Sequence, residues 1–349
     1  MNPRNIAATL FAAQDLRITE QSLGPLSPGM VRVRFGAGSI CGSDLHYFRH
    51  GRTGDFVVSS PLILGHEIAG EIVETNGPAN GLKVGDRVAV NPSRFCGACA
   101  YCREGRPNLC QNIYFMGSAS KIPHMQGGFA SIFDATPQQC VRVPANVPFA
   151  SLALAEPLSI GLHAVARAGK VAGAHLAIVG AGPIGLFTLL AAKSAGAAAT
   201  TLIDIAAAPL NFAKKLGAER VVDISGGEGE LNRLVQENPV DVAFEISGTP
   251  AGLAVALRTV KRGGTVVQVG NQPAGEVPFP ANLVMSKELD LKGVFRCGYE
   301  YQTAVDLIAS GKVEVAGIIT GRRPLAEAPE AFQLALDRSQ SVKVVLTAE

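Results

Sequence analysis

The chain has 349 residues, above the ~250–300 at which a single hydrophobic core usually divides, so two domains are expected. Apolar residues make up 47% of it and charged residues 17%, which excludes an intrinsically disordered chain. The 31 Lys and Arg residues nearly balance the 29 acids, giving a net charge of +2, and the longest basic runs are pairs. This pattern excludes the charge distribution of a protein that binds nucleic acid or an anionic membrane.

Targeting and cysteine signals favour the cytoplasm. Residues 1–6 lack the apolar run of a secretory signal peptide. The uncharged run from Leu176 to Ala192 is interrupted by glycines and a proline, so it predicts a buried strand, turn and helix rather than a membrane span. An odd total of seven cysteines argues against a disulfide framework and favours metal binding in a reducing compartment.

The chain has two parts with different predicted secondary structure. Residues 1 to about 160 are β-rich, with short alternating runs such as 31–35 and 87–90 between Gly, Pro and Asn. From about residue 165, strands and helices alternate, which predicts a parallel sheet covered by helices on both faces. The predicted strands are 176–179, 200–204, 220–222, 240–246, 264–269 and 289–295, and the predicted helices are 184–195, 209–217, 229–237 and 250–260. The tail adds a helix at 301–310 and a strand at 342–346.

The segment 180–185 has the pattern G-x-G-x-x-G, with an apolar strand before it and a helix opening from it. Gly182 would let the backbone approach a pyrophosphate at the positive N-terminus of that helix. Asp204, 19 residues after Gly185, would accept hydrogen bonds from the adenosine ribose, and its charge would favour NAD over NADP. The alternative is that Asp204 only caps the next turn. The residues predicted to bind the cofactor are Gly180, Gly182, Pro183, Ile184, Gly185, Asp204 and Val269.

Four cysteines lie within 15 residues at Cys96, Cys99, Cys102 and Cys110. Zinc prefers four such ligands in a tetrahedron, and two-residue spacers let successive sulfurs turn toward one centre. Four thiolates leave no position for water or substrate, so this zinc would be structural. The rival interpretation is a redox disulfide pair, but that motif normally opens a helix of a thioredoxin-like unit, which the sequence does not predict here.

A second set of potential ligands comprises Cys41, His66 and a carboxylate. A thiolate, an imidazole and an acid can hold a catalytic zinc with one position open, although a buried cysteine often serves only as a small apolar side chain. Adjacent strand residues point to opposite faces, so His66 and Glu67 share a metal only if the chain bends, which Gly65 would permit. Otherwise Glu67 lies behind the ligands and Glu156, an acid within an apolar run, is the third ligand; we favour Glu156.

These motifs occur in the order typical of a known enzyme family. Cys41-x2-Asp44-x-His46, Gly65-His66-Glu67, the four cysteines, Glu156-Pro157 and the glycine loop resemble the zinc-containing medium-chain alcohol/polyol dehydrogenases. Within that family, residues 41–47 and 293–296 resemble the sorbitol dehydrogenase branch. Residues 91–93, 115–119 and 123–129 resemble L-idonate 5-dehydrogenases more closely still.

The resemblance implies an α/β protein with two domains. A β-rich GroES-like catalytic domain would comprise residues 1–160 and 296–349, and a Rossmann domain with a doubly wound parallel sheet would comprise residues 161–295. The active site would lie in the cleft between them. Two zinc ions per chain, one catalytic and one structural, and NAD as the cofactor are expected, with NADP less favoured. Relatives are commonly dimers or tetramers, so a homo-oligomer is expected.

The resemblance also implies roles for individual residues. Ser43 would begin a proton relay and His46 would pass the proton to solvent, whereas Arg296 would grip a substrate carboxylate or polyol hydroxyls. Tyr47 and Phe115 would wall the substrate pocket. The alternatives are a surface role for His46, a salt bridge at the domain junction for Arg296, and core packing for the two aromatic rings.

The reaction expected from these features is NAD(P)-dependent oxidation of a sugar acid or polyol, most specifically L-idonate to 5-ketogluconate. The enzyme alternatives are sorbitol/xylitol dehydrogenase and threonine dehydrogenase. A non-catalytic structural protein recruited from the same family is the alternative of a different class, and the retained Cys41 and His66 argue against it.

Overall fold

The computed structural model describes residues 5–349. Residues 1–4, on which part of the expectation of no signal peptide rests, lie outside the described residues. The chain divides into two compact units. Unit 1 contains the residues up to Glu156 together with Tyr301–Glu349, and unit 2 contains Pro157–Glu300. The sequence analysis placed the two boundaries after residue 160 and before residue 296.

Unit 1 is built from β-sheets, as short alternating runs separated by turn residues predict. Its largest sheet has the order β12-β8-β7-β3-β20-β19, with β11 also paired to β3. These strands are β3 (Met30–Ser39), β7 (Glu67–Asn76), β8 (Arg87–Val90), β11 (Ile132–Ala135), β12 (Cys140–Arg142), β19 (Ile319–Pro324) and β20 (Lys343–Thr347). A three-stranded sheet has the order β2-β1-β6, from β1 (Ile6–Ala12), β2 (Asp15–Glu20) and β6 (Leu62–Ile63).

Shorter elements complete unit 1. Two hairpin-like pairs join β4 (Arg52–Thr53) to β5 (Phe56–Val57) and β9 (Ser93–Arg94) to β10 (Tyr114–Phe115). The helices that lie wholly in this unit are α1 (Gly42–His50), α2 (Ala100–Arg103), α3 (Phe149–Ala153) and α11 (Ala328–Leu336). Single 3-10 turns occur at Pro107–Leu109, Pro137–Gln139, Ala316–Ile318 and Leu325–Glu327.

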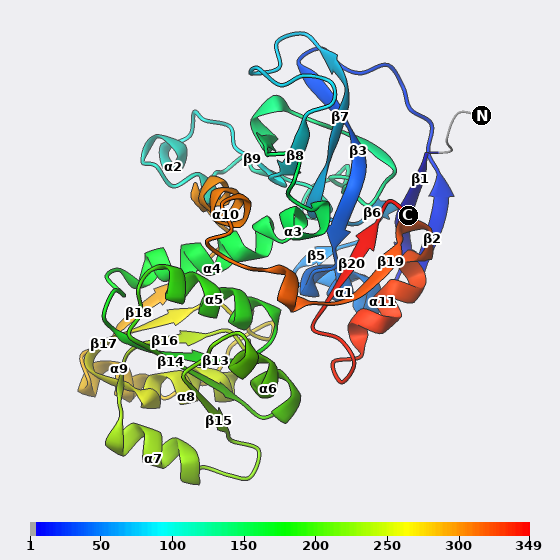
Figure 1. Cartoon of the computed structure of the whole chain (residues 1–349). Coiled ribbons are helices and arrows are strands. Elements are labelled where there is room, and N and C mark those ends of the chain that lie inside the picture. The colour runs from blue at the N-terminus through cyan, green and yellow to red at the C-terminus, as the bar shows by residue number, and fades with distance from the viewer. Residues whose placement is uncertain (1–4) are drawn as a thin grey trace. The chain divides into compact units, whose positions relative to one another are not determined.

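The C-terminal strand β20 is inserted in the sheet of the N-terminal segment. It runs antiparallel to β3, with Val345 opposite Ser39, and parallel to β19. Figure 1 shows this strand, in red, beside the blue β3. The end of the chain therefore brings the buried Lys343 next to residues that precede it by about three hundred positions.

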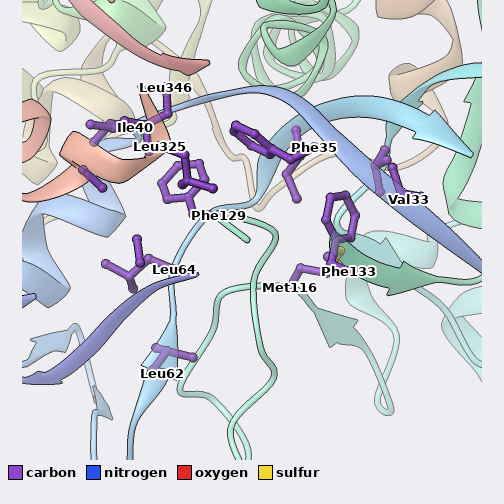
Figure 2. Packing of buried hydrophobic residues seen from close by; sticks show 14 of the residues in the cluster. Val33, Phe35, Ile40, Leu62, Leu64, Met116, Phe129, Phe133, Leu325 and Leu346 are labelled. Carbon is purple, nitrogen blue, oxygen red and sulfur yellow. The ribbon is translucent and has the colours of Figure 1, made fainter. Parts of the chain in front are cut away.

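The core of unit 1 gathers around Phe129, which is fully buried. Figure 2 shows its ring among Leu64, Ile40, Leu325 and Leu346, which come from segments far apart in the sequence. The ring also packs edge-to-face on Phe332 of α11, with centroids 6.4 Å apart. Burial of these apolar side chains is the main force that holds the two ends of the chain together.

Unit 2 contains a six-stranded parallel sheet of order β15-β14-β13-β16-β17-β18. The strands are β13 (His175–Val179), β14 (Ala199–Asp204), β15 (Arg220–Asp223), β16 (Val240–Glu245), β17 (Val260–Gln268) and β18 (Asp290–Gly293). The connecting helices are α5 (Pro183–Ser194), α6 (Ala207–Lys215), α7 (Gly229–Glu237), α8 (Pro250–Thr259) and α9 (Ala281–Ser286). Helices α5 and α8 lie on opposite faces of the sheet (Figure 1). This strand order reverses at β13, so β14 and β16 flank it, as in doubly wound nucleotide-binding folds.

Two helices, α4 (Ala155–Ala168) and α10 (Glu300–Ala309), contain the unit boundaries. The apolar stretch Phe149–Ala168, which covers α3 and α4, is long and apolar enough to cross a membrane. It is 72% buried inside the protein, however, and a core helix passes the same test. The run from Leu176 to Ala192 forms β13, a turn and α5, as predicted.

The predicted fold class is confirmed, and the elements predicted in unit 2 are all present. The sequence predicts one helix and one strand in the tail, and this prediction is incomplete because α11 and β19 are also there. Helix α11 starts with Pro329 in its first turn and buries Ala328, Ala331 and Phe332. These positions follow the i, i+3, i+4 spacing of a helix that packs on one face, but they fill only two turns.

Candidate metal and cofactor sites

Cys41 lies at the N-terminal cap of helix α1, in an extended conformation. Asp44, in the first turn of that helix, accepts a hydrogen bond from the Cys41 backbone N–H through Oδ2 at 3.0 Å. This contact satisfies one of the backbone donors that a helix N-terminus leaves unpaired. Because Asp44 is fully buried, it fixes the helix start and with it the direction of the Cys41 thiol.

The other oxygen of Asp44 faces the second candidate ligand. Asp44 Oδ1 lies 3.4 Å from His66 Nδ1, and both residues are buried. A carboxylate at one ring nitrogen orients an imidazole and leaves the other nitrogen for a metal. That other nitrogen, His66 Nε2, lies 3.5 Å from the Ser43 hydroxyl. Asp44 therefore supports Cys41 and His66 at once.

A bend at Gly65 places His66 and Glu67 on the same side. Gly65 has φ +98°, and a Cβ there would lie 2.3 Å from the Phe129 ring. Any other residue would be both strained and blocked. Strand β7 begins only at Glu67, so the alternation of strand side chains does not separate the pair. Potential ligand atoms of Cys41, His66 and Glu67 all lie within 4.8 Å of one another.

Glu67 also forms a buried ion pair. Lys343 Nζ lies 2.6 Å from Glu67 Oε2 and 2.8 Å from Oε1, and the Ser39 hydroxyl donates to the same carboxylate. Lys343 further donates to the Ile40 carbonyl at 3.0 Å. The Lys343 side chain is 3% exposed and that of Glu67 is fully buried, so each charge depends on the other.

Our preference for Glu156 as the third ligand does not agree with this grouping. Among residues 5–349, the carboxylate that joins Cys41 and His66 within 4.8 Å is that of Glu67. The reason is the bend at Gly65, which the sequence analysis treated as the less favoured case. Glu156, at the start of α4, is 5% exposed, and burial together with the negative charge of Glu67 raises its pKa to about 7.

The charge balance of this cluster fits a metal cation. Asp44, Glu67 and Glu156 are all buried around the Cys41 thiol, and Lys343 supplies one compensating positive charge. Despite burial, Asp44 and Cys41 raise the pKa of His66 well above its usual range, so a second positive charge is favoured at this point. A zinc ion held by a thiolate, an imidazole and a carboxylate would supply that charge.

The four clustered cysteines also fit a metal. All four sulfur atoms lie within 4.8 Å of one another, and Cys96 Sγ and Cys102 Sγ are 4.0 Å apart. Gly97 and Gly105 have positive φ and supply the turns between the cysteines. Backbone N–H groups of Ala98 and Cys99 lower the pKa of the Cys96 thiol to about 6, whereas burial raises the pKa of the Cys102 thiol, so the loop favours a thiolate at Cys96 before any metal binds. A closed tetrahedral zinc site fits this donor set.

The glycine loop in unit 2 has the geometry of a pyrophosphate cradle. Gly182 is the N-terminal cap of α5, and nothing lies within 4 Å of where its Cβ would be. A Cβ on Gly185 would instead meet the Gly180 carbonyl at 2.0 Å, so this glycine allows the helix to pack on the strand. Pro183 occupies the first helical turn, where its missing N–H costs nothing. Ile184 follows it, and its carbonyl accepts from the Thr188 hydroxyl.

Asp204 ends β14 beside this loop. Its Oδ2 accepts from the Ala181 N–H at 2.7 Å, and its Oδ1 accepts from Ile205 N at 2.7 Å and Ala206 N at 3.0 Å. The carboxylate thus caps the next turn and holds the glycine loop at the same time. Three of the roughly four acceptor positions of the carboxylate are thereby used, so Oδ2 keeps one for a ribose hydroxyl.

The remaining predicted residues occupy different surroundings. His46 is on the exposed side of α1, and desolvation and the positive charge of nearby His50 lower its pKa. The Phe115 ring centroid lies 5.4 Å from that of His66, next to the ligand set. Tyr47 belongs to the core at 3% exposure, and its hydroxyl accepts from Ala119 N. This burial favours the core-packing alternative for Tyr47, and its role in a substrate pocket stays a prediction.

Val269 and Arg296 lie in loops that follow strands of unit 2. Val269 follows β17, and its N–H donates to the Glu245 carbonyl at 2.8 Å. Arg296 has φ +55°, a conformation that non-glycine residues rarely adopt outside constrained loops. Its guanidinium lies 5.0 Å from the centroid of the Phe295 ring.

Asp44 and Lys343 contact the candidate ligands Cys41, His66 and Glu67, but the sequence alone predicts no role for either. Asp44 was part of the recognised motif, and its position three residues after Cys41 is that of a capping-box acid. Lys343 stands in the apolar run 342–346, where a lone charge needs a partner. That signal predicts burial with an acid, although it does not say which acid.

Two family models and several known proteins match this chain. A family model described as "Alcohol dehydrogenase GroES-like domain" matches residues 27–145, and one described as "Zinc-binding dehydrogenase" matches residues 183–310. Sorbitol dehydrogenase of Bacillus subtilis is 35% identical over 99% of this chain and 98% of its own length. L-Idonate 5-dehydrogenase (NAD(P)(+)) of Escherichia coli is 34% identical over 99% of both chains. A crystal structure of L-idonate 5-dehydrogenase from Escherichia coli superimposes with a TM-score of 0.94, at 34% identity and 99% coverage of both chains.

Proposed function

Because the chain belongs to the zinc-containing medium-chain alcohol/polyol dehydrogenases, we propose that it oxidises a secondary hydroxyl group of a sugar acid with NAD. The specific reaction proposed is the conversion of L-idonate to 5-ketogluconate. The observation that carries the enzymatic function is the buried grouping of Cys41, His66 and Glu67 within 4.8 Å. A protein with a purely structural role has no need of an open metal site of this kind.

Each residue of the site has a distinct task in this proposal. Cys41, His66 and Glu67 hold the zinc, and Asp44 keeps the imidazole in the orientation that presents Nε2. When bound, zinc stabilises the deprotonated form of a hydroxyl group at neutral pH. Ser43, whose hydroxyl lies 3.5 Å from His66 Nε2, would accept the proton that the substrate hydroxyl loses and release its own hydroxyl proton in the same step.

His46 is proposed to carry this proton onward. It lies on the same helix as Ser43, one turn later and on the exposed side. Its lowered pKa keeps the ring neutral at physiological pH, so it can accept a proton and release it to solvent.

The cofactor is proposed to be bound by the glycine loop and Asp204 of unit 2. NAD accepts the hydride that the substrate carbon loses. Gly182 leaves open space at the N-terminus of α5 for the pyrophosphate. The negative charge of Asp204 disfavours a 2′-phosphate, and the following residues, 205–208, include no arginine to hold one. We therefore propose NAD as the preferred cofactor. Because clustered thiols that bind metal are typical of a reducing compartment, we also propose a cytoplasmic enzyme.

The choice of a sugar acid depends on Arg296. A guanidinium can bind a carboxylate through two parallel hydrogen bonds, and this geometry suits an aldonate. The strained backbone at Arg296 is typical of a residue whose position is fixed for function. Sorbitol dehydrogenase activity is the second candidate, supported by the 35% identity with the Bacillus subtilis enzyme of that name.

Replacement of Arg296 by leucine tests which substrate class is correct. A charge-assisted hydrogen bond is worth about 1.5–3 kcal/mol, and each 1.4 kcal/mol is about tenfold in affinity. Arg296→Leu should therefore lower kcat/KM for L-idonate at least about tenfold more than kcat/KM for sorbitol. Arg322→Leu, at an exposed position of β19, is the control and should leave both values unchanged. Equal losses on the two substrates would favour a polyol enzyme.

A further inference from the structure

Glu245 is a fully buried carboxylate to which the proposed mechanism assigns no role. It ends strand β16 and is 0% exposed. None of the ion pairs recorded for residues 5–349 involves it. A buried carboxylate without a cationic partner is costly unless hydrogen bonds compensate. The question is therefore which groups supply those hydrogen bonds.

Three donors from two loops converge on the Glu245 carboxylate. Oε1 accepts from the Ser247 hydroxyl at 2.6 Å and from the Gly248 N–H at 2.9 Å. Oε2 accepts from the Gln272 side-chain amide at 3.1 Å. The backbone carbonyl of Glu245 also accepts from Val269 N at 2.8 Å and Gly270 N at 2.9 Å. One residue thus ties the 246–249 loop to the 269–272 loop.

The 246–249 loop is tied in turn to the glycine loop. The N–H groups of Ile246 and Ser247 donate to the Val179 carbonyl, at 2.8 and 3.0 Å. A Cβ on Gly180, the first glycine of the loop, would lie 2.8 Å from Ser247 N. The two loops are therefore in direct backbone contact.

The 246–249 and 269–272 loops are in equally close contact. A Cβ on Gly270 would lie 2.3 Å from Gly248 N, and one on Gly248 would lie 2.6 Å from the Asn271 carbonyl. Contacts this short leave no room for a side chain at Gly248 or Gly270, so the loops meet there through backbone atoms. The Glu245 carboxylate and the Gln272 amide add side-chain hydrogen bonds that link the two loops. Small movements of one loop must therefore be transmitted to the others.

These three loops follow β13, β16 and β17, which are neighbours in the sheet. Ligands of doubly wound sheets bind outside the carboxyl ends of the strands, where the strand order reverses. We propose that Glu245 is a positioning residue for the cofactor: its carboxylate holds the 246–249 loop between the glycine loop and Val269, and so sets the position of the nicotinamide half of NAD. The inference rests on the proposed function, in that these loops hold a nicotinamide cofactor during hydride transfer.

The test compares an isosteric and an apolar replacement. Glu245→Gln keeps an oxygen acceptor for Ser247 and Gly248, and Gln272 can rotate its amide to accept from the new NH2 group. Glu245→Leu has a similar volume but removes every acceptor. NADH affinity is measured by fluorescence titration, and hydride transfer by the primary deuterium isotope effect on kcat with the substrate that gives the highest activity.

We expect Glu245→Leu to weaken NADH binding about tenfold, the equivalent of about 1.4 kcal/mol of lost hydrogen bonding. It should also slow hydride transfer up to about 100-fold, as a small misplacement of reacting groups does, and so raise the isotope effect on kcat. Glu245→Gln should remain within about threefold of wild type in both measurements. If Glu245→Leu does not fold, Gln272→Met removes the hydrogen bonds of Gln272 to the Glu245 carboxylate and the Thr249 carbonyl, leaves the backbone hydrogen bonds to the Glu245 carbonyl in place, and should weaken NADH binding about threefold.

Thr259→Val is the matched control, because Thr259 is fully buried in α8 and its hydroxyl donates only within that helix. It should lower the Tm without changing NADH affinity. The inference is overturned if Glu245→Leu behaves like this control, or if Glu245→Gln falls as far as Glu245→Leu, since charge and not geometry would then matter. The measurement of NADH affinity needs no oxidisable substrate. It therefore tests the role of Glu245 even if the protein oxidises no polyol or aldonate.

Discussion

At the scale of single residues, the ion pair between Glu67 and Lys343 stabilises the buried group formed by Cys41, His66 and Glu67. The two side chains are 0% and 3% exposed, with a closest contact of 2.6 Å. Removal of one partner leaves the other charge uncompensated in the interior, which costs far more than the net contribution of the pair. The stability of unit 1 therefore depends on a lysine contributed by the last strand.

Lys343→Met should lower the free energy of unfolding by about 3–5 kcal/mol, measured by urea denaturation of protein kept free of zinc at the Cys41, His66 and Glu67 site, where Lys343 is the cation that pairs with Glu67. The double variant Glu67→Gln/Lys343→Met should recover most of that loss, because neither member of the pair is then left as an uncompensated charge. Lys261→Met is the control: its pair with Asp241 is solvent-exposed, so the cost should be about 0–1 kcal/mol. Additive losses in the double variant would show that the two residues do not act as a pair.

His46 gives the proposed relay a pH dependence of known sign. Desolvation and the neighbouring charges of His50, Arg338 and Arg49 lower its pKa below 6.5. Below that pKa the ring is protonated and cannot accept a proton, so kcat should rise with pH through a value below 6.5 and then level. His46→Gln should remove this limb of the profile measured between about pH 5 and pH 8. His175→Gln, at an exposed position, should leave the profile unchanged; an unaltered limb in His46→Gln would exclude His46 from the relay.

How much of the site the sequence predicts depends on the kind of contact. Cys41, His66 and the four clustered cysteines are recognisable because ligand type and spacing are properties of the sequence itself. The choice between Glu67 and Glu156 depends on one backbone angle at Gly65, which the sequence permits but does not require. The partner of Glu67 is 276 residues away, and no local pattern connects the two.

At the scale of elements, α1 and β20 do the most to build the site, and the sequence does not predict helix α1 or the neighbours of β20 in the sheet. Helix α1 has nine residues and few apolar side chains, so it has no clear hydrophobic period, and what marks it is the capping acid Asp44. Strand β20 was predicted, but its place between β3 and β19 is a long-range pairing. The helices and strands of unit 2 were easier to predict, because each apolar strand is followed by a helix of regular period.

The two candidate zinc sites belong to different elements and should respond differently to loss of a ligand. Cys99→Ser removes a ligand of the closed four-cysteine site and should lower the Tm, since structural zinc contributes folding energy directly. Cys41→Ser should leave the Tm within a few degrees of wild type but reduce turnover at least about 100-fold, because loss of mere supporting residues already costs about 10–100-fold.

Circular dichroism melting curves and NADH formation, measured on both variants, separate these effects. Cys140→Ser is a suitable control, since Cys140 is a buried cysteine outside both groups. Equal losses of stability and of turnover in Cys41→Ser and Cys99→Ser would contradict the division into a catalytic and a structural site.

At the scale of the whole molecule, the chain combines a β-rich unit that carries both metal sites with a doubly wound unit that carries the cofactor loops. The candidate metal ligands precede the glycine loop along the chain. The two family models match the chain in the same order, the GroES-like domain first and the zinc-binding dehydrogenase second. Relatives with two different substrate names are equally similar at 34–35% identity. The family therefore determines the chemistry, and we propose that residues such as Arg296 determine the substrate.

The most direct test of the central claim is a single assay of the zinc-loaded protein. Metal content is determined first, and NADH or NADPH formation is then measured with a panel of aldonates and polyols, with Cys41→Ser as the control. We predict about two zinc ions per chain and NADH formation from L-idonate that exceeds the rate with sorbitol and with NADP, and that is lost in the control. One zinc ion per chain and no reduced cofactor from any aldonate or polyol would contradict the account.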